Sequence, residues 1–402
     1  MYKFKPFVFV KHDSESSSID KQTPRARSGH RIVCDERYLY SYGGYNPWVP
    51  DDDRVLVDDK IWQESRPLFK ELWRFNLTTE KWTLLPGREN LPNELASTAV
   101  ILRSGKLLIH GGTAAPFGES CNNQLYVCDL DTGNVELLNV RGTLPDPHYG
   151  QALVCHGPYL YTVGGTTGFE YSCDIHRIDL RTGVWESVYI CSGRDITEPG
   201  GRYRHELAYD GKMIYLLGGG TSLECFGFTD IPAFDLEKNR WLCLQTYGDL
   251  NNNPWIPGPR RSHGSVQYTD PATGEINVII SGGYTGIHVY DDVWKLNLKR
   301  LQWTCLKKFN TVLPRPVYFH SAAVTPAGRM YTFGGINQCG SHFDSSRTSA
   351  VHSVWLVIPK LTEICWDAIS YYYKDSWKDK TRDELINIGI PLKFIKRLGF
   401  EN

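Results

Sequence analysis

A pair of adjacent glycines recurs six times along the chain, and no other feature narrows the possible folds as much. Each pair ends a short apolar run, and the pairs lie about 50 to 70 residues apart, which is typical of repeat architectures. The pairs are Gly43-Gly44, Gly111-Gly112, Gly164-Gly165, Gly218-Gly219, Gly282-Gly283 and Gly334-Gly335. Glycine at a strand end accepts a positive φ and lets another backbone come close. We therefore expect six similar units, with structural glycines and no phosphate-binding loop.

Each unit continues with a second strand-like run, and most units then carry a tryptophan. The runs are 72–77, 125–130, 175–180, 232–236, 293–298 and 354–358, and the tryptophans are Trp82, Trp185, Trp241 and Trp303. This order resembles the kelch repeat, which implies blades of four antiparallel strands around a central channel. The sequence therefore predicts an all-β fold, a six-bladed kelch β-propeller whose repeats cover about residues 25 to 358.

The sixth unit lacks a tryptophan-led fourth strand, so the ring needs another segment to cover an open strand edge. Residues 3–10 have the apolar content of a strand, and residues 11–24 are polar and rich in serine. We expect residues 3–10 to form the outer strand of the sixth blade and to close the ring. Residues 11–24 would then be a flexible connection, and the propeller would span residues 1–359.

Composition narrows the classes of function. The net charge of the 402 residues is −1, which gives no reason to expect nucleic acid or an anionic membrane as a partner. The 11 cysteines include no Cys-x-x-Cys pair, which argues against a zinc site and a disulfide framework. No apolar run is long enough to span a membrane and no signal peptide is evident. We expect a protein of the cytoplasm and nucleus with no catalytic residues, cofactor or metal.

The loops before the first strand of each unit and after the second strand should emerge on the same face. Several units carry Arg-x-x-His in the first of these loops, and four arginines on adjacent blades could converge on a carboxylate. A protein's C-terminal carboxylate is a natural ligand for such a pocket. Two other roles stay open, since each histidine could fix its loop and each arginine could form an ion pair between blades. The candidate ligand-binding residues are Arg27, Tyr149, Gln151, Arg202, Arg204, Arg260, Arg261, Tyr284, Tyr318 and His320.

The longest loop of this face, residues 46–70, is acidic. It contains Asp51-Asp52-Asp53 and Asp58-Asp59, without the regular ligand spacing of an EF-hand. We expect a solvated loop beside the pocket and no metal site.

The pattern changes from strand to helix after Pro359. Leu361, Cys365 and Ile369 recur at helical spacing, and Thr381 with Glu384 forms a capping box for a second helix. Gly389 suits the end of that helix. Ile390, Phe394 and Leu398 line one face of a third helix that starts at Pro391. Residues 360–402 are therefore expected to form a helical tail, which either packs under the propeller or docks on a partner.

The spacing of these residues resembles the two parts of a VHL box. Leu361-x3-Cys365-x3-Ile369 looks like the BC box that binds elongin C, although Lys360 stands where that box has a small residue. The second segment is similar to the cullin 2 box. This resemblance implies that Leu361, Cys365 and Ile369 bind elongin C. It also implies that cullin 2 is bound by Ile390, Pro391, Phe394 and Leu398.

Over about residues 25 to 402 the chain resembles the kelch domain-containing protein 10 family. The resemblance rests on 116–120, 149–152, 164–168, 201–206, 293–298 and 316–320. It implies a substrate receptor that joins elongin B/C and cullin 2 with its RING-box protein and binds C-terminal degrons ending in glycine or in alanine tails. It also implies a link to a Ser/Thr phosphatase in oxidative stress. Gly220 departs from related receptors, in which an arginine follows the fourth glycine pair.

Two other classes of protein are alternatives to a ligase subunit. A kelch scaffold or actin-binding protein would share the propeller but would not need the two boxes of the tail. A kelch copper oxidase needs a seven-bladed secreted propeller with tyrosine and histidine ligands around copper, and the six units argue against it. The sequence therefore favours a non-catalytic protein-binding propeller.

Overall fold

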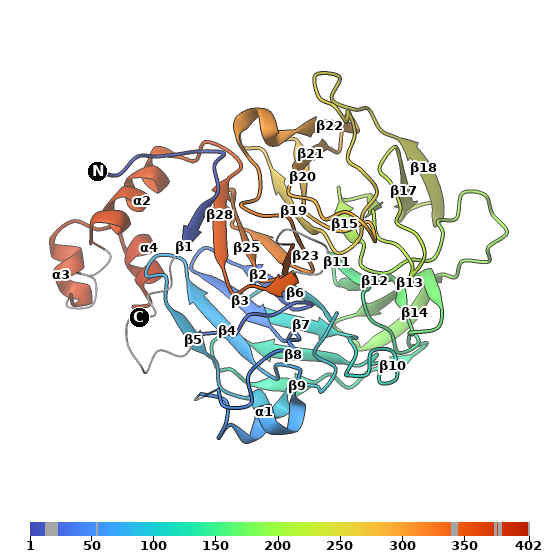
Figure 1. The fold of residues 1–402 in the computed structure, drawn as a ribbon, viewed down its shortest axis with the longest axis horizontal. Coiled ribbons are helices and arrows are strands. Elements are labelled where there is room, and N and C mark those ends of the chain that lie inside the picture. The colour runs from blue at the N-terminus through green and yellow to red at the C-terminus, as the bar shows by residue number, and fades with distance from the viewer. Residues whose placement is uncertain (13–22, 54, 339–344, 374–375, 377–379, 401–402) are drawn as a thin grey trace.

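The computed structural model describes residues 1–12, 23–53, 55–338, 345–373, 376 and 380–400. Its strands form six blades around a channel (Figure 1). The innermost strands β2, β6, β11, β15, β19 and β24 contact one another in that order, and β24 contacts β2, so the ring is closed. The predicted six-bladed kelch propeller is confirmed.

Blades 1 to 3 follow chain order from the channel outward. Blade 1 consists of β2 (Arg31–Cys34), β3 (Tyr38–Tyr42), β4 (Leu72–Asn76) and β5 (Trp82–Leu84). Blade 2 consists of β6 (Ala99–Arg103), β7 (Lys106–His110), β8 (Leu125–Asp129) and β9 (Val135–Leu137). Blade 3 consists of β11 (Ala152–His156), β12 (Tyr159–Thr166), β13 (Tyr171–Asp179) and β14 (Val184–Tyr189), and β10 (Arg141–Gly142) pairs parallel to β14.

Blades 4 and 5 repeat this order. Blade 4 consists of β15 (Glu206–Tyr209), β16 (Met213–Leu217), β17 (Asp230–Asp235) and β18 (Arg240–Gln245). Blade 5 consists of β19 (Gly264–Thr269), β20 (Ile276–Ser281), β21 (Val293–Asn297) and β22 (Gln302–Cys305). The connections contain helix α1 (Lys60–Ser65) and 3-10 helices η1 (Arg88–Asn90) and η2 (Leu306–Phe309).

Blade 6 takes its outer strand from the other end of the chain. It consists of β24 (Ser321–Val324), β25 (Arg329–Phe333), β28 (Val351–Trp355) and β1 (Val10–His12), which pairs antiparallel with β28. Closure by an N-terminal segment is confirmed, but the strand is Val10–His12 and not 3–10. Lys11 and His12 pair with β28, whereas Phe7 only donates its N–H to the carbonyl of Trp355 at the end of that strand. Most of the expected flexible connection lies outside the described residues. A small sheet of β23 (Val317–Tyr318), β26 (Ile336–Gln338) and β27 (Ser345–Arg347) rises from this blade.

The glycine pairs end the second strand of each blade, where the next blade comes close. Gly43 has φ +63°, and a Cβ atom there would lie 2.5 Å from the carbonyl oxygen of Leu95 in the loop that leads into blade 2. Trp185, Trp241 and Trp303 are fully buried between apolar side chains. The repeated glycines and tryptophans therefore have structural roles.

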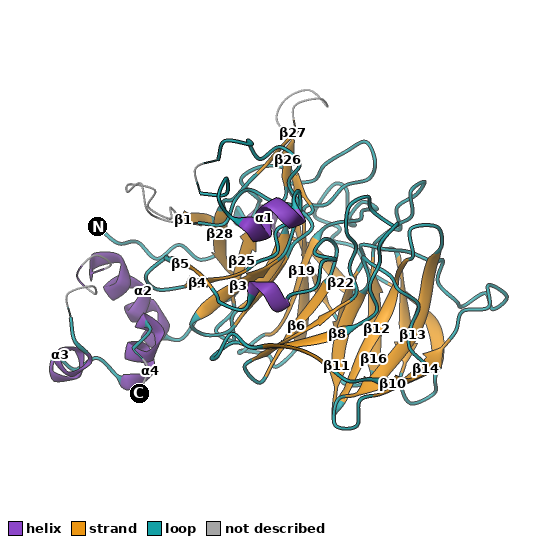
Figure 2. Cartoon of the chain, turned by 90° about the horizontal axis from the view of Figure 1, so that it is seen from below, coloured by secondary structure: helices purple, strands orange, loops and turns teal. Residues whose placement is uncertain are grey.

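The tail is helical and lies beside blades 1 and 6 (Figures 1 and 2). It contains α2 (Leu361–Tyr373), α3 (Arg382–Asn387), α4 (Leu392–Ile395) and the 3-10 helix η4 (Lys396–Leu398). The capping box predicted for the second helix is present at Thr381 and Glu384. None of the described helices is long and apolar enough to cross a membrane.

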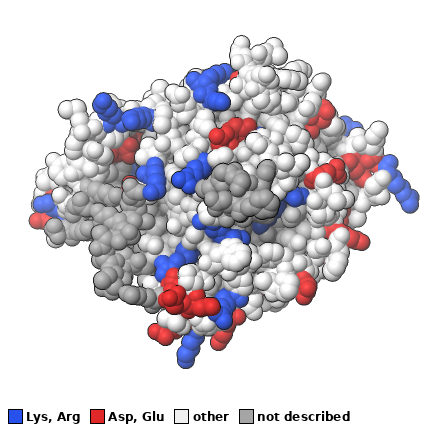
Figure 3. Space-filling model, in the orientation of Figure 1, with Lys and Arg blue, Asp and Glu red and all other residues white. Residues whose placement is uncertain are grey.

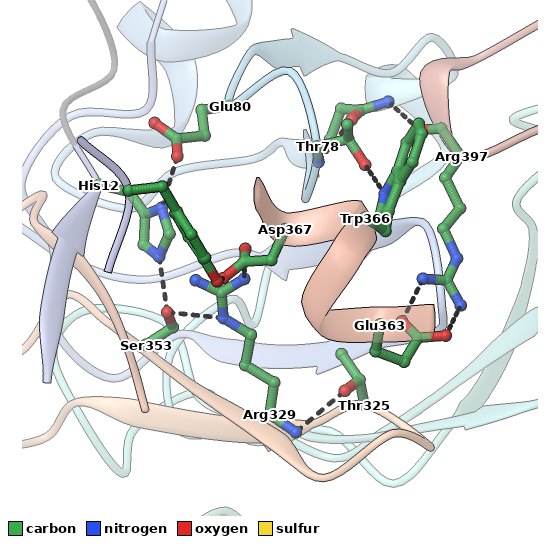
Figure 4. A network of polar contacts seen from close by, with 12 residues as sticks. His12, Thr78, Glu80, Thr325, Arg329, Ser353, Glu363, Trp366, Asp367 and Arg397 are labelled. Carbon is green, nitrogen blue, oxygen red and sulfur yellow. Dashed lines mark hydrogen bonds and ion pairs between the residues drawn. The ribbon is translucent and has the colours of Figure 1, made fainter. Parts of the chain in front are cut away.

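Polar contacts hold the tail on the propeller (Figure 4). Asp367 of α2 accepts a hydrogen bond from Arg329 of β25 at 3.0 Å. Arg329 also donates to Ser353 of β28, which contacts the ring of His12 at 2.7 Å. Trp366 donates to Thr78 of blade 1 at 3.4 Å. The closing strand, two blades and α2 are thus joined in one network.

Candidate functional site

Six residues form a closed ring of backbone hydrogen bonds around the channel. Each N–H donates to the carbonyl of the corresponding residue in the preceding blade, with distances of 2.7 to 3.3 Å. Every member has a left-handed φ between +55° and +70°. The ring residues are Gly29, Ser97, Gly150, Arg204, Ser262 and Phe319. The ring ties the blades together and sets one residue per blade at the channel opening.

Arg204 is the one charged member of this ring. Its side chain reaches from blade 4 to Ser97 of blade 2, to which Nη2 donates, and its guanidinium lies 4.6 Å from the centre of the Phe319 ring of blade 6. The residue is 7% exposed, and among the described residues its Nε has no hydrogen-bond partner. Burial, helped by the nearby charge of Arg31, lowers the pKa of Arg204 to about 9. A buried cation without an anion is costly, so the channel opening favours an anionic ligand.

One step deeper in the channel, the charges are already paired. Arg31 of β2 donates to Glu206 of β15 at 2.6 Å across the channel. Glu206 therefore pairs with Arg31 and acts on Arg204 only at a longer range.

A second layer of residues forms the rim just outside the ring. Each residue that precedes a ring member pairs with the residue that follows a glycine pair, which confirms that the two sets of loops share one face. The pairs are Ser28 with Tyr45, Ala96 with Thr113, Tyr149 with Thr166, Tyr203 with Gly220, Arg261 with Tyr284, and Tyr318 with Ile336. Five of these twelve residues are tyrosines.

Four of the tyrosines of the rim contact one another in two pairs. Tyr284 and Tyr318 are stacked with ring centres 4.8 Å apart, and Tyr149 and Tyr203 meet edge to face at 6.1 Å. All four are partly exposed. We refer to Arg204, Phe319, these four tyrosines, Tyr45, Arg261 and Arg347 as the mouth.

Two further arginines lie at the rim. Arg347 lies 5.0 Å from the centre of the Tyr45 ring and donates to Ser28 at 2.9 Å. Arg261 lies 5.9 Å from the centre of the Tyr203 ring. Within the part of the chain that the structure describes, neither these arginines nor Arg204 forms an ion pair with a carboxylate. Figure 3 shows several basic side chains around the middle of this face, with some acidic ones nearby. The mouth thus combines three arginines without an ion pair among the described residues with several aromatic rings.

Three of the arginines that were expected to bind a ligand have structural roles instead. Arg27, Arg202 and Arg260 are buried, and each donates to the carbonyl of the first glycine of its own blade's pair, at 2.9 to 3.1 Å. Their guanidinium groups lie on Phe69, Phe226 and Tyr290 at 4.1, 3.6 and 3.7 Å. Arg27 also pairs with Glu71, and Arg260 with Asp292. The expectation that they bind a ligand is wrong, because their donors are used inside the blades.

Gln151 and His320 are also buried away from any ligand. Gln151 donates to the carbonyl of His110 at 2.9 Å, and the His320 ring lies 3.2 Å from the hydroxyl of Ser281. His30 and His205 donate to carbonyls of the preceding blade at 3.0 and 3.1 Å, so these histidines fix loops. Of the ten candidates, the structure brings five together at the mouth, namely Tyr149, Arg204, Arg261, Tyr284 and Tyr318.

Sequence reasoning missed four residues of the mouth. Tyr45 and Tyr203 could have been found by aligning the residues next to each glycine pair and each ring position. Phe319 occupies the same column as Arg204. Arg347 lies on β27, whose pairing with β26 gives no signal in the sequence.

Some aspartates of the acidic loop are bonded to arginines of the same chain. Asp53 accepts two hydrogen bonds from Arg25, at 2.8 and 2.7 Å. Asp59 caps α1 through the N–H of Trp62 and accepts a bond from Arg88 at 2.7 Å. These contacts fix the loop beside the mouth.

The two box-like faces of the tail differ in burial. Leu361 is 73% exposed and Ile369 36% exposed, and Cys365 is exposed on the same face of α2. Phe394 is 5% exposed and stacks on Trp366 at 4.8 Å. Ile390 and Leu398 pack against the same cluster.

Phe394 lies in the core of the tail, and Ile390 and Leu398 are partly buried against it. Pro391 of the same predicted box is exposed, as are Ile388 and Leu392 beside it. Cullin 2 binding by Ile390, Pro391, Phe394 and Leu398 therefore stays a prediction, with Phe394 the least accessible of the four.

Known proteins are similar to this chain over nearly its whole length. Residues 62–272 match the family model described as the KLHDC2/KLHL20/DRC7 Kelch-repeats domain. The Kelch domain-containing protein 10 homolog of Drosophila melanogaster is 42% identical over 414 residues, which cover 99% of this chain and 66% of that protein. Kelch domain-containing protein 10 of Xenopus tropicalis is 41% identical over 94% of this chain and 87% of that protein. The Homo sapiens protein is 40% identical over 93% of this chain and 80% of that protein.

Proposed function

This chain belongs to the kelch domain-containing protein 10 family, and we propose from this premise that it is the substrate-recognition subunit of a cullin 2–elongin B/C ubiquitin ligase. In this role the propeller binds the C-terminus of a substrate, and the tail binds elongin C and cullin 2 with its RING-box protein. The chain itself carries out no chemistry. Such a receptor would act in the cytoplasm and nucleus.

The observation that carries the proposal is the position of Arg204. Its guanidinium is buried at the channel opening, has no carboxylate partner among the described residues and lies against Phe319. A C-terminal carboxylate supplies the missing anion and can accept two parallel hydrogen bonds from the guanidinium. Arg261 and Arg347 add positive potential at the rim, which steers an anionic chain end toward the opening.

The remaining ring positions favour a ligand with small terminal residues. The ring is closely packed, since a Cβ atom at Gly29 would lie 3.2 Å from Nη2 of Arg204 and one at Gly150 would lie 3.0 Å from the Tyr203 ring. Ser97 and Ser262 are buried. A chain that ends in glycine or alanine can bring its carboxylate down to Arg204, while a bulky last side chain would meet the ring. Aromatic rim residues then contact the backbone and methyl groups of the preceding residues.

The tail supports the second half of the proposal. Leu361, Cys365 and Ile369 expose one apolar face of α2, while Trp366 anchors an adjacent face on the propeller. A helix with one face packed and one apolar face open is suited to docking in a groove. The tail lies at the side of blades 1 and 6, away from the mouth loops (Figure 2), so both partners can bind at once.

The receptor would then act by raising the effective concentration of substrate near the ubiquitin-charged enzyme. The test is a reconstituted reaction with elongin B/C, neddylated cullin 2 and its RING-box protein, using a reporter that ends in an alanine tail. We expect ubiquitin transfer with the wild-type chain and its loss with either Arg204→Met or the double variant Leu361→Ser/Ile369→Ser. Transfer that survives both changes would contradict the proposal, and peptide binding without elongin binding would indicate a scaffold.

A further inference from the structure

Three successive blades carry the same turn in the loop that follows the glycine pair. The turns are 167–170, 221–224 and 285–288 in blades 3, 4 and 5. In each, the threonine N–H donates to the carbonyl three residues later, at 2.9 to 3.2 Å. The threonine hydroxyl accepts from the N–H groups two and three residues later. The three loops are therefore held in one shape.

Each turn presents one large apolar side chain at its tip. Phe169 is 86% exposed, Leu223 is 95% exposed and Ile287 is 77% exposed. A single exposed apolar residue is common on protein surfaces, but the same position in three neighbouring loops makes a shared apolar surface. We refer to these three residues as the tips.

Among the described residues, the threonine turn with an apolar tip is found in blades 3 to 5. Blade 1 also has an exposed apolar residue three positions after its rim residue Tyr45, namely Trp48, which is 79% exposed but does not follow a threonine. In blade 2 the equivalent residue is Pro116, and the next residue, Phe117, contacts Tyr45 with ring centres 4.8 Å apart and is 50% exposed. The three like turns thus lie side by side on blades 3 to 5.

The tips are continuous with the mouth. Phe169, Leu223 and Ile287 each come three residues after a rim residue, namely Thr166, Gly220 and Tyr284. Three residues of extended chain span about 10 Å at most. A ligand chain that leaves the ring over blades 3 to 5 therefore passes the rim and then meets a tip.

We propose that the tips bind apolar side chains of the substrate about four to six residues before its C-terminus. This inference rests on the proposed function, because it takes the chain end to be held at Arg204. One or two terminal residues occupy the ring, and about three more cover the distance from rim to tip. The substrate class is thereby narrowed to chain ends with a small terminus preceded by an apolar segment.

The test measures peptide affinity for the full chain by fluorescence anisotropy. The probes are tetra-alanine, a decapeptide with three alanines at its end and leucines at positions four to six, and the same decapeptide with serines in place of the leucines. The variant is Phe169→Ser/Leu223→Ser/Ile287→Ser. Its control is Leu137→Ser, which changes an exposed apolar residue on the outer strand β9. All four side chains are at least half exposed, so folding should be unaffected.

We expect the triple variant to bind the leucine decapeptide about tenfold more weakly and the other two probes as the wild type does, since burying such side chains is worth about one decade of affinity. Equal binding of the leucine decapeptide by wild type and triple variant would overturn the inference. So would an equal loss for all three probes, or a change in self-association without a change in affinity.

The same probes separate this inference from the proposed function. Loss of tetra-alanine binding in Arg204→Met, with no effect of the triple variant on any probe, would support the mouth and overturn the tips. Leucine-dependent binding that survives amidation of the peptide but is lost in the triple variant would support the tips and contradict the carboxylate site. Failure of every probe to bind the wild type would contradict both.

Discussion

Arg27, Arg202 and Arg260 lie in the same place in three blades, and Arg204 lies two residues further on, at a ring position. The first three donate to backbone carbonyls inside their blades. Arg204 has a left-handed backbone, φ +56°, which turns its side chain to the channel and away from the blade. Arginines at the first position are therefore structural, and the arginine two residues further along the chain is a candidate for ligand binding.

This division predicts opposite effects on stability. Arg260→Met should lower the free energy of unfolding by about 3 kcal/mol or more, because it leaves Asp292 without its partner. Arg204→Met should leave it unchanged or raise it, since a buried charge without a carboxylate partner among the described residues is removed. Urea unfolding of both variants checks this, and a large loss in Arg204→Met would show that this arginine is structural.

The sequence could not separate these arginines. Arg-x-x-His places Arg27, Arg202 and Arg260 in one column, and that column is the structural one. Arg204 aligns with Gly29, Ser97 and Gly150, and only the backbone geometry shows that this column faces the channel. The tyrosines of the rim could be expected from the strand-loop pattern, whereas Arg347 depends on a small sheet without a repeat signal.

At the level of elements, two segments of the tail have the same apolar spacing but opposite environments. Leu361, Cys365 and Ile369 are exposed, while Phe394 packs on Trp366. Helical periodicity tells which residues share a face, but not whether the chain itself covers that face. The sequence therefore predicted the helices and the capping box correctly, but it did not show that Phe394 of the second apolar face packs inside the tail.

Changes on the two faces should have different consequences. Leu361→Ser/Ile369→Ser should abolish co-purification with elongin B/C while leaving the tail folded. Phe394→Ser should make the tail sensitive to limited proteolysis, because losing a buried aromatic ring costs about 3 to 5 kcal/mol. If the double variant is proteolysed as fast as Phe394→Ser, its loss of elongin would be a folding defect.

The closing strand should also hold the tail in place. His12 contacts Glu80 and Ser353, and Ser353 accepts from Arg329, which binds Asp367 of α2. His12→Ala should cost about 1 to 3 kcal/mol and speed amide exchange in α2 as well as in β28. Val10→Ala, at a 43% exposed position of the same strand, is the control. Normal exchange in α2 would refute the coupling.

The whole molecule is a ring whose blades are joined at every interface by close glycine contacts. Buried histidines add to several of these interfaces. Such long-range closure follows from the six glycine pairs, which is why the architecture could be predicted from one sequence. The exact residues of the closing strand could not be predicted. Residues 3–10 and Val10–His12 are equally plausible strands until the register with β28 is known.

The buried histidines predict loss of stability in mild acid. Burial lowers the pKa of His205 and His110 to about 3 and of His148 and His320 to about 4. The unfolded chain has its histidine pKa values near 6.5 and therefore binds more protons below that pH. Stability should be constant above about pH 7 and fall between pH 6.5 and 4, by up to about 1.4 kcal/mol per pH unit for each histidine. Urea unfolding between pH 4 and 7 measures this change in the free energy of unfolding. A free energy of unfolding that does not change with pH would contradict the claim that these histidines are neutral in the folded protein.

The central claim is that the mouth binds a chain end through its carboxylate. The most direct measurement compares the affinity of the full chain for an alanine-ended peptide as the free acid and as the C-terminal amide, with wild type and Arg204→Met. We predict that the wild type binds the acid at least tenfold more tightly than the amide, as for a hydrogen bond to a charged group worth about 1.5 to 3 kcal/mol, and that Arg204→Met binds both equally weakly. Equal binding of acid and amide by the wild type would contradict the account.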